Sequence, residues 1–249
     1  MADMVGKALR LLSLLGDYPE GVALSELGRA AGFPVSTTHR LLSSLQAEGF
    51  VRSDPESKRY ALGLRLFELG QRVSHARGFA GVALPVMERV SAHTGEPTLL
   101  AVRDGSDQLY VHAVPGSRQV QIRGEPGTRG PLHCTSMGKC LVAFASVPER
   151  TRLVAELDLP GLAPRTITAR AAFEREIDLV RTQGYAIADE EHEAGIRAAG
   201  VPVCGPDGVA IAALSTAAPA FRTSVEQLTG FVPVLRTAAR ELAAVLPYR

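Results

Sequence analysis

The sequence lacks several features that mark particular classes of protein. Its 249 residues contain no tryptophan, only 5% aromatic residues and three cysteines, Cys134, Cys140 and Cys204. Three cysteines are too few, and odd in number, for a disulfide framework, so we expect a reducing, cytoplasmic location. No run of about 18 apolar residues occurs, which argues against any membrane contact through a spanning helix. The net charge of +1 does not by itself indicate a nucleic-acid partner.

The N-terminal quarter of the chain combines helical spacing of apolar residues with a short hairpin. We expect one compact unit over residues 1–62, followed by a connector helix within 63–77. Ser25 is expected to cap the second helix, and Gly49 to end the third. The expected elements are helices at 5–16, 25–31, 35–48 and 64–76, and strands at 50–52 and 59–62.

Residues 78–249 are expected to form a second, α+β domain. Hairpins with helices grouped around them favour an antiparallel sheet with flanking helices over a parallel βαβ sheet. The last helix is expected to bend near Pro233. The expected elements are helices at 79–93, 135–146, 148–157, 169–183 and 223–246, and strands at 98–104, 108–114, 118–124, 198–204 and 209–216.

The third expected helix begins with small hydroxyl side chains and one arginine, and continues with leucines on the opposite face. In a helix-turn-helix, the second helix presents such an N-terminal end to the major groove of DNA. A purely structural three-helix unit, with Ser36 acting only as a helix cap, is the alternative. The candidate DNA-binding residues are Ser25, Ser36, Thr37, Thr38, His39, Arg40, Arg52, Lys58 and Arg59.

Several segments together resemble the IclR family of transcriptional regulators, in the same order and over about residues 5–246. They include "GFPVSTTHRLLSSLQAEGFV", "PLHCTSMGKCLVAF", "RTQGYAIADEEHEAGIRAAGVPV" and "IAALSTAAP". The resemblance implies a winged helix-turn-helix with recognition helix 35–48 and wing 50–62. It also implies a GAF-like domain at 78–249 that binds an effector and oligomerises. On this basis we expect a homodimer or homotetramer that binds a pseudo-palindromic operator and represses neighbouring catabolic genes.

The resemblance further implies an effector pocket at the start of the helix near residue 135. Free N–H groups at a helix start suit a carboxylate, although from the residues alone a simply capped helix explains the pattern equally well. The implied effector-binding residues are Leu132, His133, Cys134, Thr135, Ser136, Met137, Gly138, Ala188, Ile196, Ala198, Ser215 and Ala217.

At three of these positions the chain departs from the family pattern. Members often have an acidic residue, a cysteine and a serine where this chain has Ala188, Ala198 and Ala217. A buried polar group without its hydrogen bond costs about 1–3 kcal/mol, so the loss of polar partners disfavours a very small, multiply polar oxoacid. We therefore expect a bulkier effector, an aromatic or branched carboxylic acid or amide.

The histidines and cysteines raise an alternative function, an enzyme or metal-dependent sensor. His133 and His192 with the three cysteines offer zinc ligands, or a Cys–His pair assisted by Glu190, Glu191 or Glu193. No pair has CxxC or HxxxH spacing and no nucleophile motif surrounds a cysteine. We therefore expect no metal, no cofactor and no catalysis. The run 189–193 is expected to form a solvated rim or helix cap, with Arg197 paired to one of its acids.

Overall fold

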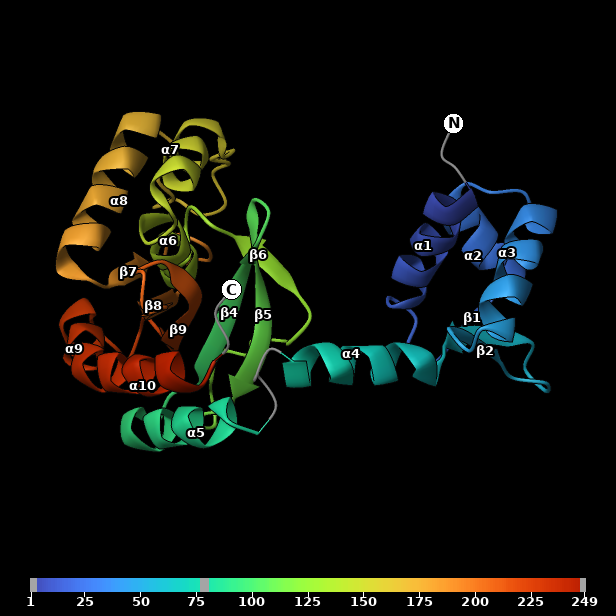
Figure 1. The fold of residues 1–249 in the computed structure, drawn as a ribbon, viewed down its shortest axis with the longest axis horizontal. Coiled ribbons are helices and arrows are strands. Elements are labelled where there is room, and N and C mark those ends of the chain that lie inside the picture. Colours follow the sequence, from blue (N-terminus) through green and yellow to red (C-terminus); the bar gives the residue numbers. More distant parts are fainter. Residues whose placement is uncertain (1–3, 77–80, 247–249) are drawn as a thin grey trace. The chain divides into compact units, whose positions relative to one another are not determined.

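The computed structural model describes residues 4–76 and 81–246, and the chain separates into two compact units, Met1–His75 and Ala76–Arg249 (Figure 1). The boundary expected between residues 77 and 78 lies outside the described residues. Each unit has its own core and is described by itself. No helix in the described part of the chain is long and apolar enough to cross a membrane.

The first unit packs a helical bundle against a small antiparallel sheet of order β1-β3-β2. Its core is formed by the apolar faces of the first three helices, including Leu11, Leu27 and Leu42. The sequence did not predict β1, because two residues are too few to show an alternating pattern. The elements are α1 (Met4–Leu15), β1 (Val22–Ala23), α2 (Leu24–Ala31), α3 (Val35–Ala47), β2 (Val51–Ser53), β3 (Arg59–Leu62) and α4 (Leu64–Ala76).

The α2–α3 turn depends on two glycines. Gly32 ends α2 in the left-handed region, with φ 71°, and its N–H donates to the carbonyl of Arg29. Gly28 lets the helices approach closely, because a Cβ there would lie 3.1 Å from Oγ1 of Thr38. The prediction for Ser25 is wrong: it lies inside α2, whose N-cap is Ala23 without a side-chain cap, because β1 leads directly into the helix.

The second unit is built on an antiparallel sheet of order β6-β5-β4-β9-β8-β7. This confirms the expected α+β class with an antiparallel sheet. The strands are β4 (Thr98–Asp104), β5 (Asp107–Val114), β6 (Arg129–Pro131), β7 (Ala186–Asp189), β8 (Ile196–Cys204) and β9 (Ala210–Pro219). The helices are α5 (Ala83–Thr94), α6 (Ser136–Ala143), α7 (Val147–Glu156), α8 (Arg170–Gln183), α9 (Val225–Gly230) and α10 (Val232–Val245).

Helices cover both faces of this sheet, with α5 and α10 on one face and α6 to α8 on the other (Figure 1). Successive strand residues point to opposite faces, so Leu100 joins the core under α10 while Leu99 joins the core under α6. The two cores are separate clusters of buried residues. Helix α6 packs on β8 and β9, and its first residue, Ser136, lies against Gly200 of β8.

Two sequence predictions in this unit are wrong, and one helix is shorter than predicted. Residues 118–124 form no strand; they belong to an irregular segment between β5 and β6. The helix expected at 223–246 is two helices, and they meet at Phe231, close to Pro233, where a bend was expected. A capping box at Ser224 starts α9, and Pro233 lies in the first turn of α10, where its missing N–H is tolerated. The helix expected at 79–93 begins at Ala83, and residues 79 and 80 lie outside the described part.

Candidate functional site

The start of α3 presents most of its polar candidates to solvent. Ser36, His39 and Arg40 are exposed, and Thr37 is half-buried. These side chains lie on successive turns of one helix face, as neighbours three and four residues apart do. The helix has no side-chain N-cap, so its first N–H groups and its positive dipole end are open to an anion. This geometry suits a recognition helix.

Thr38 does not belong to that exposed face. Its side chain is fully buried, and Oγ1 donates to the carbonyl of Pro34 at 3.1 Å while packing against Gly28. The expectation that Thr38 faces DNA is therefore wrong, because the close α2–α3 contact takes up this position of the helix.

The hairpin formed by β2 and β3 holds the other basic candidates. Arg52, Lys58 and Arg59 are exposed, and Lys58 adopts a left-handed conformation with φ 58° at the turn. The Asp54 carboxylate accepts the N–H of Glu56 at 2.9 Å, and this bond lowers the pKa of Asp54 and fixes the turn. Arg59 Nη1 donates to the carbonyl of Gly21 at 2.8 Å, so part of its guanidinium is already used.

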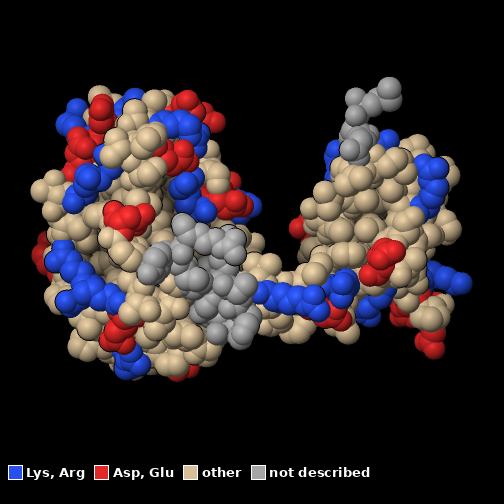
Figure 2. Space-filling view, viewed as in Figure 1, with Lys and Arg blue, Asp and Glu red and all other residues tan. Residues whose placement is uncertain are grey.

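Basic and acidic side chains are interspersed on the face of the protein seen in Figure 2. No large uniformly basic area is visible on that face of either unit, which agrees with the net charge of +1. On that face, basic side chains are therefore not gathered into one broad surface for DNA.

The second unit contains a cavity of about 310 Å³ at the N-terminus of α6. Its walls come from α6, all six strands of the sheet, the segment between β7 and β8, and the irregular segment that precedes β6. Eight of the twelve expected effector residues line it: Thr135, Ser136, Met137, Ala188, Ile196, Ala198, Ser215 and Ala217.

The α6 end of the cavity carries unused hydrogen-bonding groups. The Thr135 hydroxyl caps the helix by accepting the N–H of Gly138 at 3.0 Å. Ser136 and Ser215 are only 2% and 1% exposed, yet their hydroxyls make no hydrogen bond within residues 4–76 and 81–246. The N–H groups of Ser136 and Met137 likewise have no acceptor in that part of the chain. Together these groups suit an anionic or strongly accepting ligand group.

The floor of the cavity is an apolar row across three strands. Ala188 pairs with Ala198, and Ala198 pairs with Ala217, so the three departures from the family pattern are neighbours in the sheet. Leu99 and Met137 extend this apolar surface. A flat apolar body fits against such a row, while a ligand with polar groups on every side would leave some of them unpaired.

Four expected effector residues do not line the cavity. Leu132 and Cys134 are buried in the adjoining core, and burial raises the pKa of the Cys134 thiol to about 12. His133 Nε2 lies 3.0 Å from the carbonyl of Pro160, and burial lowers its pKa. Gly138 faces the protein, since a Cβ there would lie 2.5 Å from Leu132 Cα.

Sequence reasoning missed a second group of lining residues. Among them is Tyr110, whose Oη accepts a hydrogen bond from Gln108 Nε2 at 3.0 Å. The phenolic O–H therefore remains free to donate to a ligand. Burial raises the pKa of Tyr110. The glycines and proline in "GEPGTRG", residues 124–130, indicate a loop. The alternating polar and apolar residues just before them suggested a strand instead. The missed residues are Leu99, Tyr110, Ile122, Arg123, Gly124, Glu125, Thr128, Arg129, Gly130, His192 and Glu193.

A fully buried lysine supports one wall of the cavity. Lys139 Nζ donates to Glu176 Oε1 at 2.7 Å, to Glu191 Oε1 at 2.8 Å and to the carbonyl of Ile187 at 2.5 Å. It thereby ties α6 to α8, to β7 and to the segment that carries the lining residue His192. Burial raises the pKa of Glu191, against the opposing effect of Lys139.

The acidic run 189–193 is only partly solvated. The expectation of a solvated rim or helix cap is wrong for Glu191, which is buried against Lys139. Asp189 and Glu190 pair with Arg197 at 2.6 and 3.4 Å, which confirms the ion pair expected for that arginine.

The environment of the cysteines differs from that of reactive or metal-binding thiols. Burial raises the pKa of all three thiols, to about 11 for Cys204, whereas a reactive cysteine needs a lowered pKa. Within the described ranges, 4–76 and 81–246, no three His, Cys, Asp or Glu side chains converge to hold a metal ion.

A helix-turn-helix with a wing, followed by a domain with a ligand-sized cavity, defines a ligand-responsive DNA-binding regulator. The family model for the IclR helix-turn-helix domain matches residues 4–55, and that for the bacterial transcriptional regulator IclR C-terminal domain matches residues 71–244. The chain belongs to the IclR family of bacterial transcriptional regulators.

Curated relatives and solved structures agree with this assignment. The HTH-type transcriptional regulator KdgR of Escherichia coli K12 is 34% identical over 242 residues, covering 97% of this chain and 92% of the relative. The transcriptional repressor IclR of the same organism is 29% identical, covering 95% and 87%. The crystal structure of an IclR homolog from Microbacterium hydrocarbonoxydans, complexed with 4-hydroxybenzoate, has a TM-score of 0.86 at 31% identity and covers 98% of this chain and 99% of that one.

Proposed function

We propose that this regulator represses neighbouring catabolic genes in the cytoplasm and releases its operator when a carboxylic acid occupies the cavity at α6. It binds DNA as a homodimer through the start of α3 and the wing. A two-fold dimer implies a pseudo-palindromic operator with half-sites separated by about 34 Å or a multiple of it. Relatives named as repressors support the sign of regulation.

The observation that carries the effector assignment is the pair of buried, unpaired hydroxyls of Ser136 and Ser215 beside the free N–H groups of α6. These groups donate to the ligand carboxylate. The ring or branched body of the ligand lies against the row of three alanines. The Tyr110 hydroxyl, which also lines the cavity, supplies a further donor or acceptor. The structure of a relative that holds 4-hydroxybenzoate supports this chemical class.

A thermal-shift comparison of acids tests the proposal. We expect 4-hydroxybenzoate to raise the unfolding midpoint with a concentration dependence that follows mass action, and glyoxylate and pyruvate to leave it unchanged. Ser136→Ala and Ser215→Ala should each weaken the shift, while Ser146→Ala, at an exposed serine outside the cavity, should keep it. Stabilisation by glyoxylate or pyruvate but not by aromatic or branched acids would contradict the assignment.

A further inference from the structure

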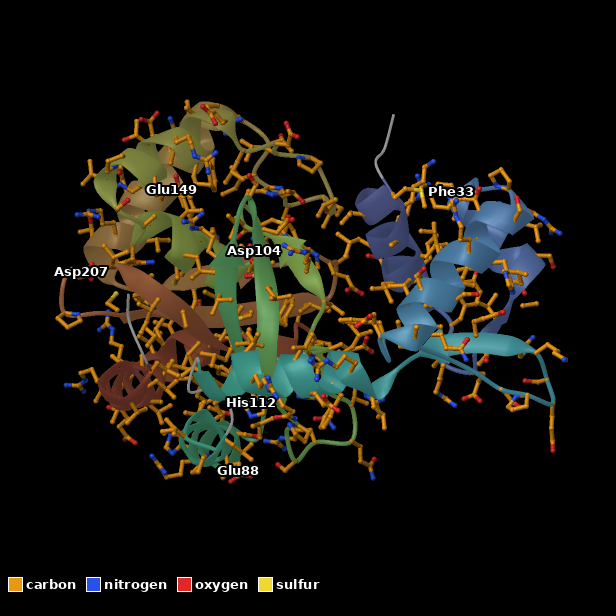
Figure 3. All side chains as sticks on the ribbon, turned by 45° about the vertical axis from the view of Figure 1, so that its right-hand side comes forward. Phe33, Glu88, Asp104, His112, Glu149 and Asp207 are labelled. Carbon is orange, nitrogen blue, oxygen red and sulfur yellow. The ribbon has the colours of Figure 1, made fainter. Side chains whose placement is uncertain are left out.

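Phe33 lies in the turn before the recognition helix. Two cationic side chains of α1 pack against its ring. Lys7 Nζ and Arg10 Cζ both lie 5.7 Å from the ring centroid, and Phe33 can be located in Figure 3. The ring is half-buried and packs on the core of the first unit. A half-buried ring fixed in this way holds the two flexible cationic side chains beside the start of α3.

These two cations are not neutralised by an acidic side chain in the described part of the chain. Neither Lys7 nor Arg10 has an acidic partner within the described parts of the chain, and α1 itself contains no acidic residue. Arg10 is exposed and Lys7 is half-buried. By contrast, Arg65 in α4 is paired with Glu68 at 2.7 Å. The positive charges of Lys7 and Arg10 are therefore available to an anion of a binding partner.

The N-terminal end of α1 lies beside the exposed face of the recognition helix. Arg40 Nη2 lies 3.6 Å from Sδ of Met4, at the first residue of α1. Ser36 and Arg40 are one helical turn apart on α3, and Phe33 comes just before that helix. Two parts of α1 therefore lie near the start of α3. The cationic side chains of Lys7 and Arg10 contact Phe33, and the first residue of α1 contacts Arg40.

We propose that Lys7 and Arg10 bind a DNA backbone phosphate beside the groove that α3 enters, with Phe33 positioning both side chains. This rests on the proposed DNA binding and adds contacts outside α3 and the wing. A lysine contributes a point charge and an arginine a planar fork of donors, and both bind phosphodiesters. Such contacts fix the register of a protein on the duplex and do not depend on base sequence.

The test uses full-length protein and a short duplex of scrambled sequence, titrated over a series of salt concentrations. Each of Lys7→Gln and Arg10→Gln removes one contact per protomer, and therefore two from the homodimer. Each should reduce the slope of log affinity against log salt by about 1.8 and weaken binding about 60-fold at about 0.1 M salt. Arg175→Gln removes an exposed arginine from α8 of the other unit and should change neither quantity. Lys7→Arg and Arg10→Lys keep the charge and should keep the slope.

The outcomes separate this inference from the proposed function. A wild-type protein that binds the duplex, together with Lys7→Gln and Arg10→Gln variants of unchanged slope, overturns the phosphate contact alone. The same unchanged slope with a lowered unfolding midpoint assigns the two cations to packing on Phe33, which also overturns it. A wild-type protein that binds no duplex at any salt concentration contradicts DNA binding itself, and the inference with it.

Discussion

The two units of this regulator carry their functional groups in opposite settings. In the first, Ser36, His39 and Arg40 stand exposed on a small core, and their side chains contribute little to that core. In the second, Ser136 and Ser215 are almost fully buried beside a lysine with no exposed surface. Exposed groups can be changed with little effect on folding, whereas buried groups couple binding to stability. Mutations should therefore separate affinity from stability in the first unit and combine them in the second.

The largest effect is expected at Lys139. Lys139→Met leaves the carboxylates of Glu191 and Glu176 without their cation, and removing one partner of a buried pair costs about 3–5 kcal/mol. Urea denaturation at neutral pH measures this loss. Lys139→Met combined with Glu191→Gln should recover part of it, because no charge is then left at the most buried acid.

The Lys139→Met deficit should also depend on pH. The pKa of Glu191 is raised in the folded protein, so its carboxyl stabilises the fold at low pH, and that contribution is lost as pH rises through the folded-state value. Lowering the pH protonates the orphaned acid and should narrow the gap to wild type. A deficit that is below about 1 kcal/mol at neutral pH, or that widens on acidification, would show that the buried pair does not hold this wall.

Arg40→Ala is expected to abolish operator binding and to leave the unfolding midpoint nearly unchanged. The side chain is exposed and its one described contact is with Met4, so folding loses little. A base contact of this kind contributes about 1–3 kcal/mol, and a two-fold dimer loses it twice. A gel-shift titration at fixed salt measures the change, with Arg175→Ala as the control. Unchanged binding removes Arg40 from the interface.

Ala198→Leu should fill the middle of the alanine row and block the cavity. Extra methylene groups in a packed site cost about 1–3 kcal/mol, which here falls on ligand binding. We expect the shift with 4-hydroxybenzoate to disappear while DNA binding remains. Ala244→Leu adds the same bulk at an exposed position of α10 and should behave as wild type. A full response in Ala198→Leu would place the ligand elsewhere.

Thr38→Val gives the smallest expected effect and sharpens the contrast within α3. The buried side chain loses one hydrogen bond to Pro34, worth about 1 kcal/mol, and keeps its shape. DNA affinity should not change, because this side chain does not reach the surface. A loss of binding comparable with that of Arg40→Ala would return Thr38 to the DNA interface.

Local patterns predicted much of the fold because they depend on neighbouring residues. The strand Thr98–Asp104 and the connector helix Leu64–Ala76 have the bounds expected from their alternation and spacing. The strand expected at 118–124 is wrong, because alternating residues also occur in irregular segments. Here Ile122 lines the cavity and Val120 is exposed, so neither packs on a sheet face. The prediction that Ser25 caps the second helix is wrong because β1 leads directly into α2.

The site was less predictable because its parts meet only in the folded chain. The family resemblance indicated the residues at the start of α6 and the three alanines, and the strand register places those alanines side by side. Nothing local indicates that Lys139 is buried, since its three acceptors come from α8, β7 and the following segment. Tyr110 was missed for the same reason: it lines the cavity from a strand distant in sequence from α6.

Occupation of the cavity should change the affinity of the exposed groups in the first unit for DNA. The direct test measures the dissociation constant of full-length protein for DNA upstream of its own gene, with and without saturating 4-hydroxybenzoate, and then the ligand's dissociation constant with and without that DNA. Binding linkage requires both ratios to be equal, and allosteric coupling of about 1–3 kcal/mol predicts a weakening of about 5-fold to 150-fold. Ligand binding that leaves the affinity for DNA unchanged would show that the cavity does not control DNA binding.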